Sequence, residues 1–167
     1  QWHALHVLEH EVGLWTSADR KCFFHVFFLP EVWRPFMAFD RKVPPEVFDL
    51  PEGGPWMHAA CTAPGMGWTS SVGVCQHFHR NMVRHGNALP QSLAPEAEIR
   101  RDRPVPITAR AAERSAWELY IDNFEEFEAL HAAEASALRG TVSACLPAAR
   151  GGYAAWGAVG NSAKDLL

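Results

Sequence analysis

The sequence contains no uninterrupted apolar run of about 18 residues, the length that a transmembrane helix needs. Its first residues, QWHALHVLEHEVG, also lack the basic region and apolar core that mark a secretory signal. The four cysteines, Cys22, Cys61, Cys75 and Cys145, form no Cys-x-x-Cys pair, which argues against a disulfide framework and a cysteine-rich zinc site. These absences predict an intracellular protein with reduced thiols and no membrane partner.

An excess of positive charge is also missing. The formal net charge is -4, whereas a protein whose whole surface binds nucleic acid is usually basic. The balance does not exclude a metal-dependent enzyme, because a site for two divalent cations must itself be acidic. Aromatic residues are plentiful instead: 10 Phe and 7 Trp supply apolar area for a folded core. A length of 167 residues suits one compact domain.

Hydrophobic periodicity predicts a mixed α+β fold. The clearest helix covers residues 70–85, where Val72, Cys75, Phe78 and Met82 recur at three- and four-residue steps. The other predicted elements are a helix in 1–13, strands in 14–19, 35–39, 56–63 and 117–124, an alanine-rich helix from about 129 to 150, and loops in 41–55 and 86–108. This order favours an antiparallel sheet with helices packed on one face.

Two aspartates lie on or next to predicted strands. Asp19 ends the first strand and precedes an apolar run, and Asp122 lies within the apolar strand 117–124. A buried carboxylate is costly unless a cation or a hydrogen-bond donor compensates it. Carboxylates from separate strands can hold magnesium, so the pair predicts a two-metal site for phosphoryl transfer. The alternative for Asp19 is a helix cap.

Two segments, one around Asp19 and one at residues 65–76, resemble motifs A and B of reverse transcriptases. In motif A an Asp is followed five residues later by an aromatic residue, here Asp19 and Phe24. Motif B is a Gly-Trp pair, a turn of small residues and a helix that bears Gln. Residues 65–76, GMGWTSSVGVCQ, match it through Gly67, Trp68 and Gln76.

The next two segments resemble motifs C and D, in the expected order. Motif C is the Tyr-x-Asp-Asp box, which residues 120–123 match as Tyr120, Ile121, Asp122 and Asn123. Motif D is a glycine turn that leads to a lysine, here residues 156–164 with Lys164. The chain therefore resembles the reverse-transcriptase palm domain of a divergent eukaryotic retroelement, over residues 14–164.

The resemblance implies a ferredoxin-like palm and template-directed addition of deoxynucleotides, with two Mg²⁺ or Mn²⁺ ions as cofactors. Its implied partners are an RNA or DNA template-primer and deoxynucleoside triphosphates. It assigns Asp19, Asp122 and Asn123 to the metals, and Lys164 to protonating or neutralising the leaving pyrophosphate. The residues implied to lie at the nucleotide are Phe23 or Phe24 through a backbone amide, Phe24 also as a gate against the 2′-hydroxyl, and Gly67, Trp68, Gln76 and Tyr120.

The same resemblance predicts that residues 1–167 are a single palm domain, with fingers and thumb segments outside the chain. The sequence starts with Gln rather than Met, which also indicates a fragment. Asn123 stands where most of the family has a second Asp, and this substitution removes one charge from the site. An alternative function is therefore a catalytically degenerate palm that acts as a nucleic-acid-binding or interaction module.

A third hypothesis comes from the N-terminal segment. His6-Val-Leu-Glu9-His10 fits the His-x-x-Glu-His pattern, in which two histidines bind zinc and a glutamate activates water. On a helix, His6 and His10 share a face and His3 lies nearly beside them. This pattern predicts a zinc hydrolase.

Overall fold

The computed structural model describes residues 2–85, 93–108, 114–135, 137, 145–158 and 160. The chain divides into two compact units. Unit 1 comprises Gln1–Phe23 and Gly73–Leu167, and unit 2 comprises Phe24–Val72.

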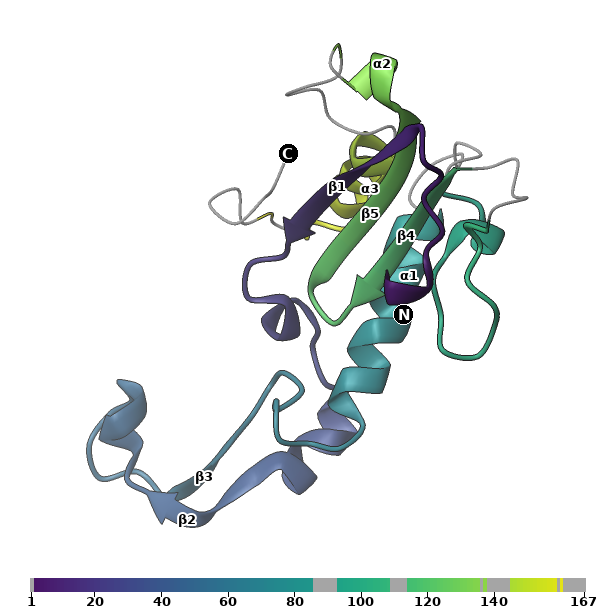
Figure 1. Ribbon diagram of the computed structural model, residues 1–167. Coiled ribbons are helices and arrows are strands. Elements are labelled where there is room, and N and C mark those ends of the chain that lie inside the picture. The colour runs from purple at the N-terminus through teal and green to yellow at the C-terminus, as the bar shows by residue number, and fades with distance from the viewer. Residues whose placement is uncertain are drawn as a thin grey trace. The chain divides into compact units, whose positions relative to one another are not determined.

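Unit 1 is built on a three-stranded antiparallel sheet. β5 (Asn123–His131) is the central strand, with β1 (Glu11–Asp19) on one side and β4 (Ser115–Tyr120) on the other (Figure 1). β4 and β5 form a hairpin, in which Tyr120 pairs with Asn123 and leaves a two-residue turn.

Two helices cover one face of this sheet. They are α1 (Ser71–His85), whose residues from Gly73 onward belong to unit 1, and α3 (Cys145–Ala155) (Figure 1). The helices approach each other closely, because a Cβ atom on Gly152 would lie 2.5 Å from the Met82 carbonyl oxygen. The buried side chains of this layer include Ala18, Trp117, Leu119 and Phe124 from the strands and Cys75, Val83, Leu146 and Tyr153 from the helices. The predicted α+β class, with an antiparallel sheet and helices, is confirmed.

The opposite face of the sheet is partly covered by segments from outside it. Ile99, Ile107, Ala116, Phe127 and Ala129 form a buried cluster, and Trp2 and Leu5 pack against it. Short 3-10 helices lie in both covering segments, at Trp2–Ala4 and Pro95–Ala97.

Buried and half-buried ion pairs tie these segments to the sheet and to α1. Glu98, which is 1% exposed, accepts from Arg80 Nε at 2.6 Å and from Arg84 at 2.5 Å. Arg114 binds Glu11 through both carboxylate oxygens, with Nε 2.8 Å from Oε1. This bidentate pair holds the pKa of Glu11 below its usual range.

Unit 2 contains a two-stranded antiparallel sheet of β2 (Ala38–Val43) and β3 (Met57–Ala60). Two 3-10 helices accompany the strands: Glu31–Met37 precedes β2, and Pro45–Phe48 lies between β2 and β3. A third 3-10 helix, Phe23–Val26, begins at the last residue of the first segment of unit 1. Most of its large apolar side chains are exposed: Phe28, Val32, Trp33, Phe36, Phe39, Val47, Phe48, Leu50, Trp56 and Met66. A two-stranded sheet with so little buried apolar area is marginally stable by itself.

Some predicted elements are confirmed. The predicted helix 70–85 is α1, and the strands predicted in 14–19 and 56–63 correspond to β1 and β3. The predicted strand 35–39 is wrong in its first half, because Pro35 lies inside a 3-10 helix and β2 begins at Ala38.

Three further predictions are wrong. Residues 1–13 are not a helix, because Trp2 and Leu5 pack on the sheet and β1 already begins at Glu11. The region predicted as one strand, 117–124, turns back on itself at Ile121 and Asp122. The predicted alanine-rich helix is wrong for residues 129–131, which end β5, whereas α2 (Ala132–Ala135) and the first six residues of α3 lie within its predicted range. Pairing of β5 with two neighbouring strands overrides the helix propensity of its Glu, Ala and Leu residues.

Candidate active site

The β4–β5 turn has an unusual central residue. Ile121 has a φ of 55°, in the left-handed region that disfavours β-branched residues. Two-residue hairpin turns normally place Gly, Asn or Asp at such positions. The backbone of Ile121 must therefore be held by contacts outside the turn.

The end of β1 meets this turn. Asp19 pairs with Asn123 in the β1–β5 register, and the Arg20 backbone N–H donates to the Asp122 carbonyl oxygen at 2.9 Å. Asp19 is only 7% exposed, whereas Asp122 and Asn123 are half-buried. The backbones of all three residues with predicted metal roles therefore come together at one end of the sheet.

Sheet register also assigns a face to two of these residues. Residues paired directly across antiparallel strands project to the same side of the sheet. Asp19, Asn123 and Tyr120 form one such row at the end of the sheet. The neighbouring row, Ala18, Phe124 and Leu119, is buried beneath the helices. Asp19 and Asn123 consequently lie on the sheet face opposite α1 and α3, where Tyr120 is 60% exposed.

A row of acidic residues lies on the same face, one step further into the sheet. Ser17 pairs with Glu125, and Glu125 pairs with Glu118. Burial raises the pKa of Glu118, and the nearby Glu125 carboxylate raises it further. Burial also raises the pKa of Glu125, and a hydrogen bond from Trp2 partly offsets this effect. The face that carries Asp19 is therefore acidic over two adjacent rows.

Gln76 binds the turn from the helix side. Its Nε2 donates to the Leu119 carbonyl oxygen, and its Oε1 accepts from the Ile121 backbone N–H at 2.7 Å. The side-chain amide thus satisfies polar backbone groups on both sides of Tyr120. The structure places this predicted nucleotide-site residue directly against the hairpin that carries Asp122.

His79 lies one helical turn beyond Gln76 and is fully buried. Its Nδ1 lies 2.8 Å from the Ile121 carbonyl oxygen and its Nε2 lies 2.6 Å from the Tyr153 hydroxyl. A carbonyl oxygen only accepts, so Nδ1 carries the hydrogen, and in the neutral ring Nε2 accepts from Tyr153. Burial lowers the pKa of His79 to about 4, which favours this neutral form.

Arg20 and Phe23 complete the layer around His79. The Arg20 guanidinium lies 4.1 Å from the centre of the Tyr153 ring, and the Phe23 ring lies 4.8 Å from the His79 ring. Arg20 and Phe23 are 4% and 2% exposed. The side chain of Phe23 is therefore part of the core of unit 1, and any nucleotide contact of this residue falls to its backbone, as the motif resemblance implied.

His79, Tyr153 and Arg20 are absent from the residues predicted for the site. Gln76 and His79 are three residues apart, a spacing that places both on the same helix face, and this is the signal for His79. Tyr153 could not be predicted in this role, because its segment carries no motif that relates it to the turn.

The remaining residues predicted at the nucleotide belong to unit 2. Phe24 is half-buried and Gly67 is exposed. Trp68 packs edge-on against Trp33, with ring centres 5.7 Å apart. Lys164 lies outside the described residues.

The helical arrangement predicted for His6 and His10 is wrong. Residues 5–10 belong to no helix, so His6 and His10 do not share a helix face. The His6 carbonyl oxygen accepts from Arg114 at 2.7 Å, and the His10 ring lies 5.4 Å from the ring of His131. Within the described part of the chain, no group of three or more His, Cys, Asp or Glu side chains is arranged to hold a metal ion.

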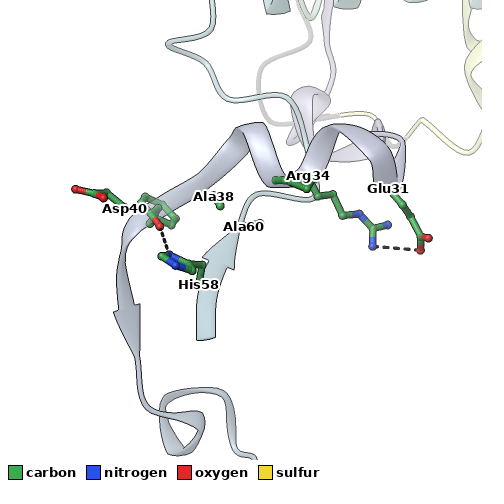
Figure 2. Close-up of a pocket in the computed structure, with 8 residues that line it drawn as sticks. Glu31, Arg34, Ala38, Asp40, His58 and Ala60 are labelled. Carbon is green, nitrogen blue, oxygen red and sulfur yellow. Dashed lines mark hydrogen bonds and ion pairs between the residues drawn. The ribbon is translucent and has the colours of Figure 1, made fainter. Parts of the chain in front are cut away.

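Unit 2 contains a cavity of about 730 Å³ that involves none of the predicted site residues. Figure 2 shows Asp40 and His58 on one side of it and the Arg34–Glu31 ion pair on the other. His58 Nδ1 lies 2.8 Å from the Phe39 carbonyl oxygen, so this nitrogen carries the hydrogen. The cavity combines both signs of charge with apolar walls and favours no particular ligand.

Comparison of the chain with family models and with curated protein sequences finds no match. Among the described residues, no helix is both long enough and apolar enough to cross a membrane.

Proposed function

We propose that this chain is the palm part of a reverse-transcriptase-type polymerase and contributes to template-directed addition of deoxynucleotides. The observation that carries the proposal is the meeting of β1 with the β4–β5 turn. It brings Asp19 opposite Asn123 and joins Arg20 to Asp122 by a backbone hydrogen bond. The strand order β1-β5-β4 is also the order in which the first three strands of a ferredoxin-like core lie.

The donor groups at this end of the sheet suit divalent cations. Asp19, Asp122 and Asn123 offer hard oxygen ligands, which Mg²⁺ and Mn²⁺ prefer. Asp19, Asp122 and Asn123 would hold these ions, whose chemistry would be to activate the 3′-hydroxyl and to neutralise charge on the leaving pyrophosphate. The acidic row of Glu118 and Glu125 adds negative charge on the same face.

The remaining predicted site residues have proposed roles in binding the nucleotide or in holding the β4–β5 turn. Gln76 holds the hairpin, Tyr120 lies exposed in the Asp19 row, and Phe24, Gly67 and Trp68 would contact the deoxynucleotide. Lys164 would protonate or neutralise the pyrophosphate. These roles require the template-primer and the fingers and thumb segments as partners.

Primer extension by the parent polymerase tests the proposal. With a primed RNA template and Mg²⁺, Asp19→Asn and Asp122→Asn should each lower the rate about a hundredfold or more. Glu52→Gln, in an exposed loop of unit 2, is the control and should leave the rate unchanged. Undiminished extension by Asp122→Asn would refute the proposed metal role.

A second candidate function is an inactive palm that serves as an interaction module. Two observations favour it: Asn123 in place of an acidic ligand, and the exposed apolar side chains of unit 2. If the parent protein extends no primer with Mg²⁺ or Mn²⁺, even after Asn123→Asp, this candidate replaces the first.

A further inference from the structure

The turn that carries Asp122 is held from the helix side by a set of hydrogen bonds to its backbone. Gln76 binds Leu119 and Ile121, and His79 binds the Ile121 carbonyl oxygen. Both polar groups of the Ile121 backbone are thus engaged by one helix, α1. Such contacts can maintain a left-handed conformation that a β-branched residue does not favour by itself.

The bond from His79 depends on a second helix. His79 can donate from Nδ1 in its neutral form only when Nε2 lacks a hydrogen, and Tyr153 of α3 supplies the donor that Nε2 accepts. Tyr153 is itself fixed, since its ring lies against the buried guanidinium of Arg20. Arg20 directly follows Asp19 and donates its backbone N–H to Asp122. The contacts therefore run from Ile121 through His79, Tyr153 and Arg20 to the backbone of Asp122.

We propose that His79 and Tyr153 are positioning residues, which hold the backbone of Ile121 and thereby fix the conformation of the turn that carries Asp122. The inference deepens the proposed function and rests on it only for the metal role of Asp122. His79 and Tyr153 touch neither substrate nor metal in this scheme. Their effect reaches the site through the backbone of one residue.

Amide hydrogen exchange in the ¹⁵N-labelled full chain tests the positioning role. His79→Leu removes the donor to the Ile121 carbonyl oxygen, so the turn should open more often. The Ile121 amide, which donates to Gln76, should then exchange about tenfold faster relative to the β1–β5 amides. His79→Asn places an N–H near the position of Nδ1 and should restore most of the protection. A purely structural role predicts instead that all amides of the sheet lose protection together and that Asn gives no selective rescue.

Two further variants keep the test decisive. Tyr153→Phe retains the ring beside Arg20 and removes only the hydroxyl, so it should shift Ile121 exchange in the same direction even if His79→Leu does not fold. His77→Leu is the matched control, because His77 lies exposed on the same helix and its Nε2 lies 3.0 Å from Asn81 Nδ2. Unchanged Ile121 exchange in Tyr153→Phe relative to wild type, with no folded His79→Leu, would overturn the inference.

Mn²⁺ separates this inference from the proposed function. Paramagnetic broadening at the amides of Asp19 and Asp122 should appear in the wild type, weaken in Tyr153→Phe and return in His79→Asn relative to His79→Leu. Absence of broadening in the wild type would refute the metal site and leave the exchange result to decide the positioning role. Broadening that is equally strong in all variants, together with selective loss of Ile121 protection, would limit the role to the turn and overturn its link to Asp122.

Discussion

Acid should destabilise unit 1 through His79, whose neutral form the fold requires. Burial lowers the pKa of His79 from 6.5 to about 4, against a smaller opposing effect of the hydrogen bond to Ile121. Between these two values the unfolded chain binds a proton that the folded chain does not, so the free energy of unfolding falls as pH falls. The contribution is fully present above about pH 7 and is about 2 kcal/mol smaller at pH 5.

The charged groups near His79 oppose its protonation, whereas the hydrogen bond to the Ile121 carbonyl oxygen favours it. Arg20 after β1 and Arg80 on α1 lower its pKa through their charges. The Tyr153 hydroxyl on α3 would have to change from donor to acceptor if Nε2 gained a hydrogen. No carboxylate is among the causes of the shift, and the Ile121 carbonyl oxygen is the one group among these causes that favours a positive charge.

Urea denaturation of the wild type and of His79→Asn at pH 7.5 and pH 5 measures the effect. Fluorescence of the buried Trp117 reports on unit 1. The stability advantage of the wild type over His79→Asn should shrink by about 2 kcal/mol between the two pH values. The exposed His77→Asn variant controls for general acid effects. A wild-type advantage that is the same at both pH values would refute the argument.

Three other predictions concern backbone and charge. The Ile121→Gly variant should be more stable than Ile121→Ala by about 1 kcal/mol, the reverse of the usual order of these residues, because φ of Ile121 is 55°. Equal stability of the two variants in urea denaturation would contradict the left-handed turn. Gly152→Ala should lower the free energy of unfolding by about 1–3 kcal/mol, since its Cβ would lie 2.5 Å from the Met82 carbonyl oxygen. Gly73→Ala, in open space on α1, should raise it by about 0.5–1 kcal/mol. Thermal denaturation of both variants tests the close helix contact. Glu98→Gln should lower the free energy of unfolding in chemical denaturation by about 2–3 kcal/mol, because it leaves Arg80 and Arg84 without their carboxylate. Asp102→Asn, at the exposed partner of Arg100, should change it little. Equal effects of the two substitutions would argue against the buried pair.

The elements with a clear period were predictable from sequence. Helix α1 follows from apolar residues at three- and four-residue steps, and its observed start at Ser71 differs from the prediction by one residue. Strand β5 was not predictable in the same way. Its sequence, NFEEFEALH, consists largely of good helix formers, and only the partners on both of its edges make it a strand.

The candidate site, like the fold, was predictable from sequence only in part. The predicted strands and the resemblance to motifs A and C lead to the expectation that Asp19 and Asp122 lie together, and the register brings Asp19 opposite Asn123. The contacts beneath the turn depend on tertiary packing, because Gln76, His79 and Tyr153 come from helices separated along the chain by the whole hairpin. The spacing of Gln76 and His79 places both on one helix face, but it does not say that this face contacts the turn.

The turn itself is the strongest local reason to look for function at this end of the sheet. A hairpin selected only for stability would place Asn or Gly at the position of Ile121, because these residues accept a positive φ at low cost. This chain instead keeps Ile121 and uses side chains of α1 to satisfy both of its backbone polar groups. Conflicts between local preference and fold are expected to concentrate at functional sites. The unfavourable conformation of Ile121 lies one residue from Asp122. It is stabilised by side chains of α1, the helix whose N-terminal part resembles motif B. If the proposed function is correct, the helix beside the nucleotide and the turn beside the metals are coupled through this one residue.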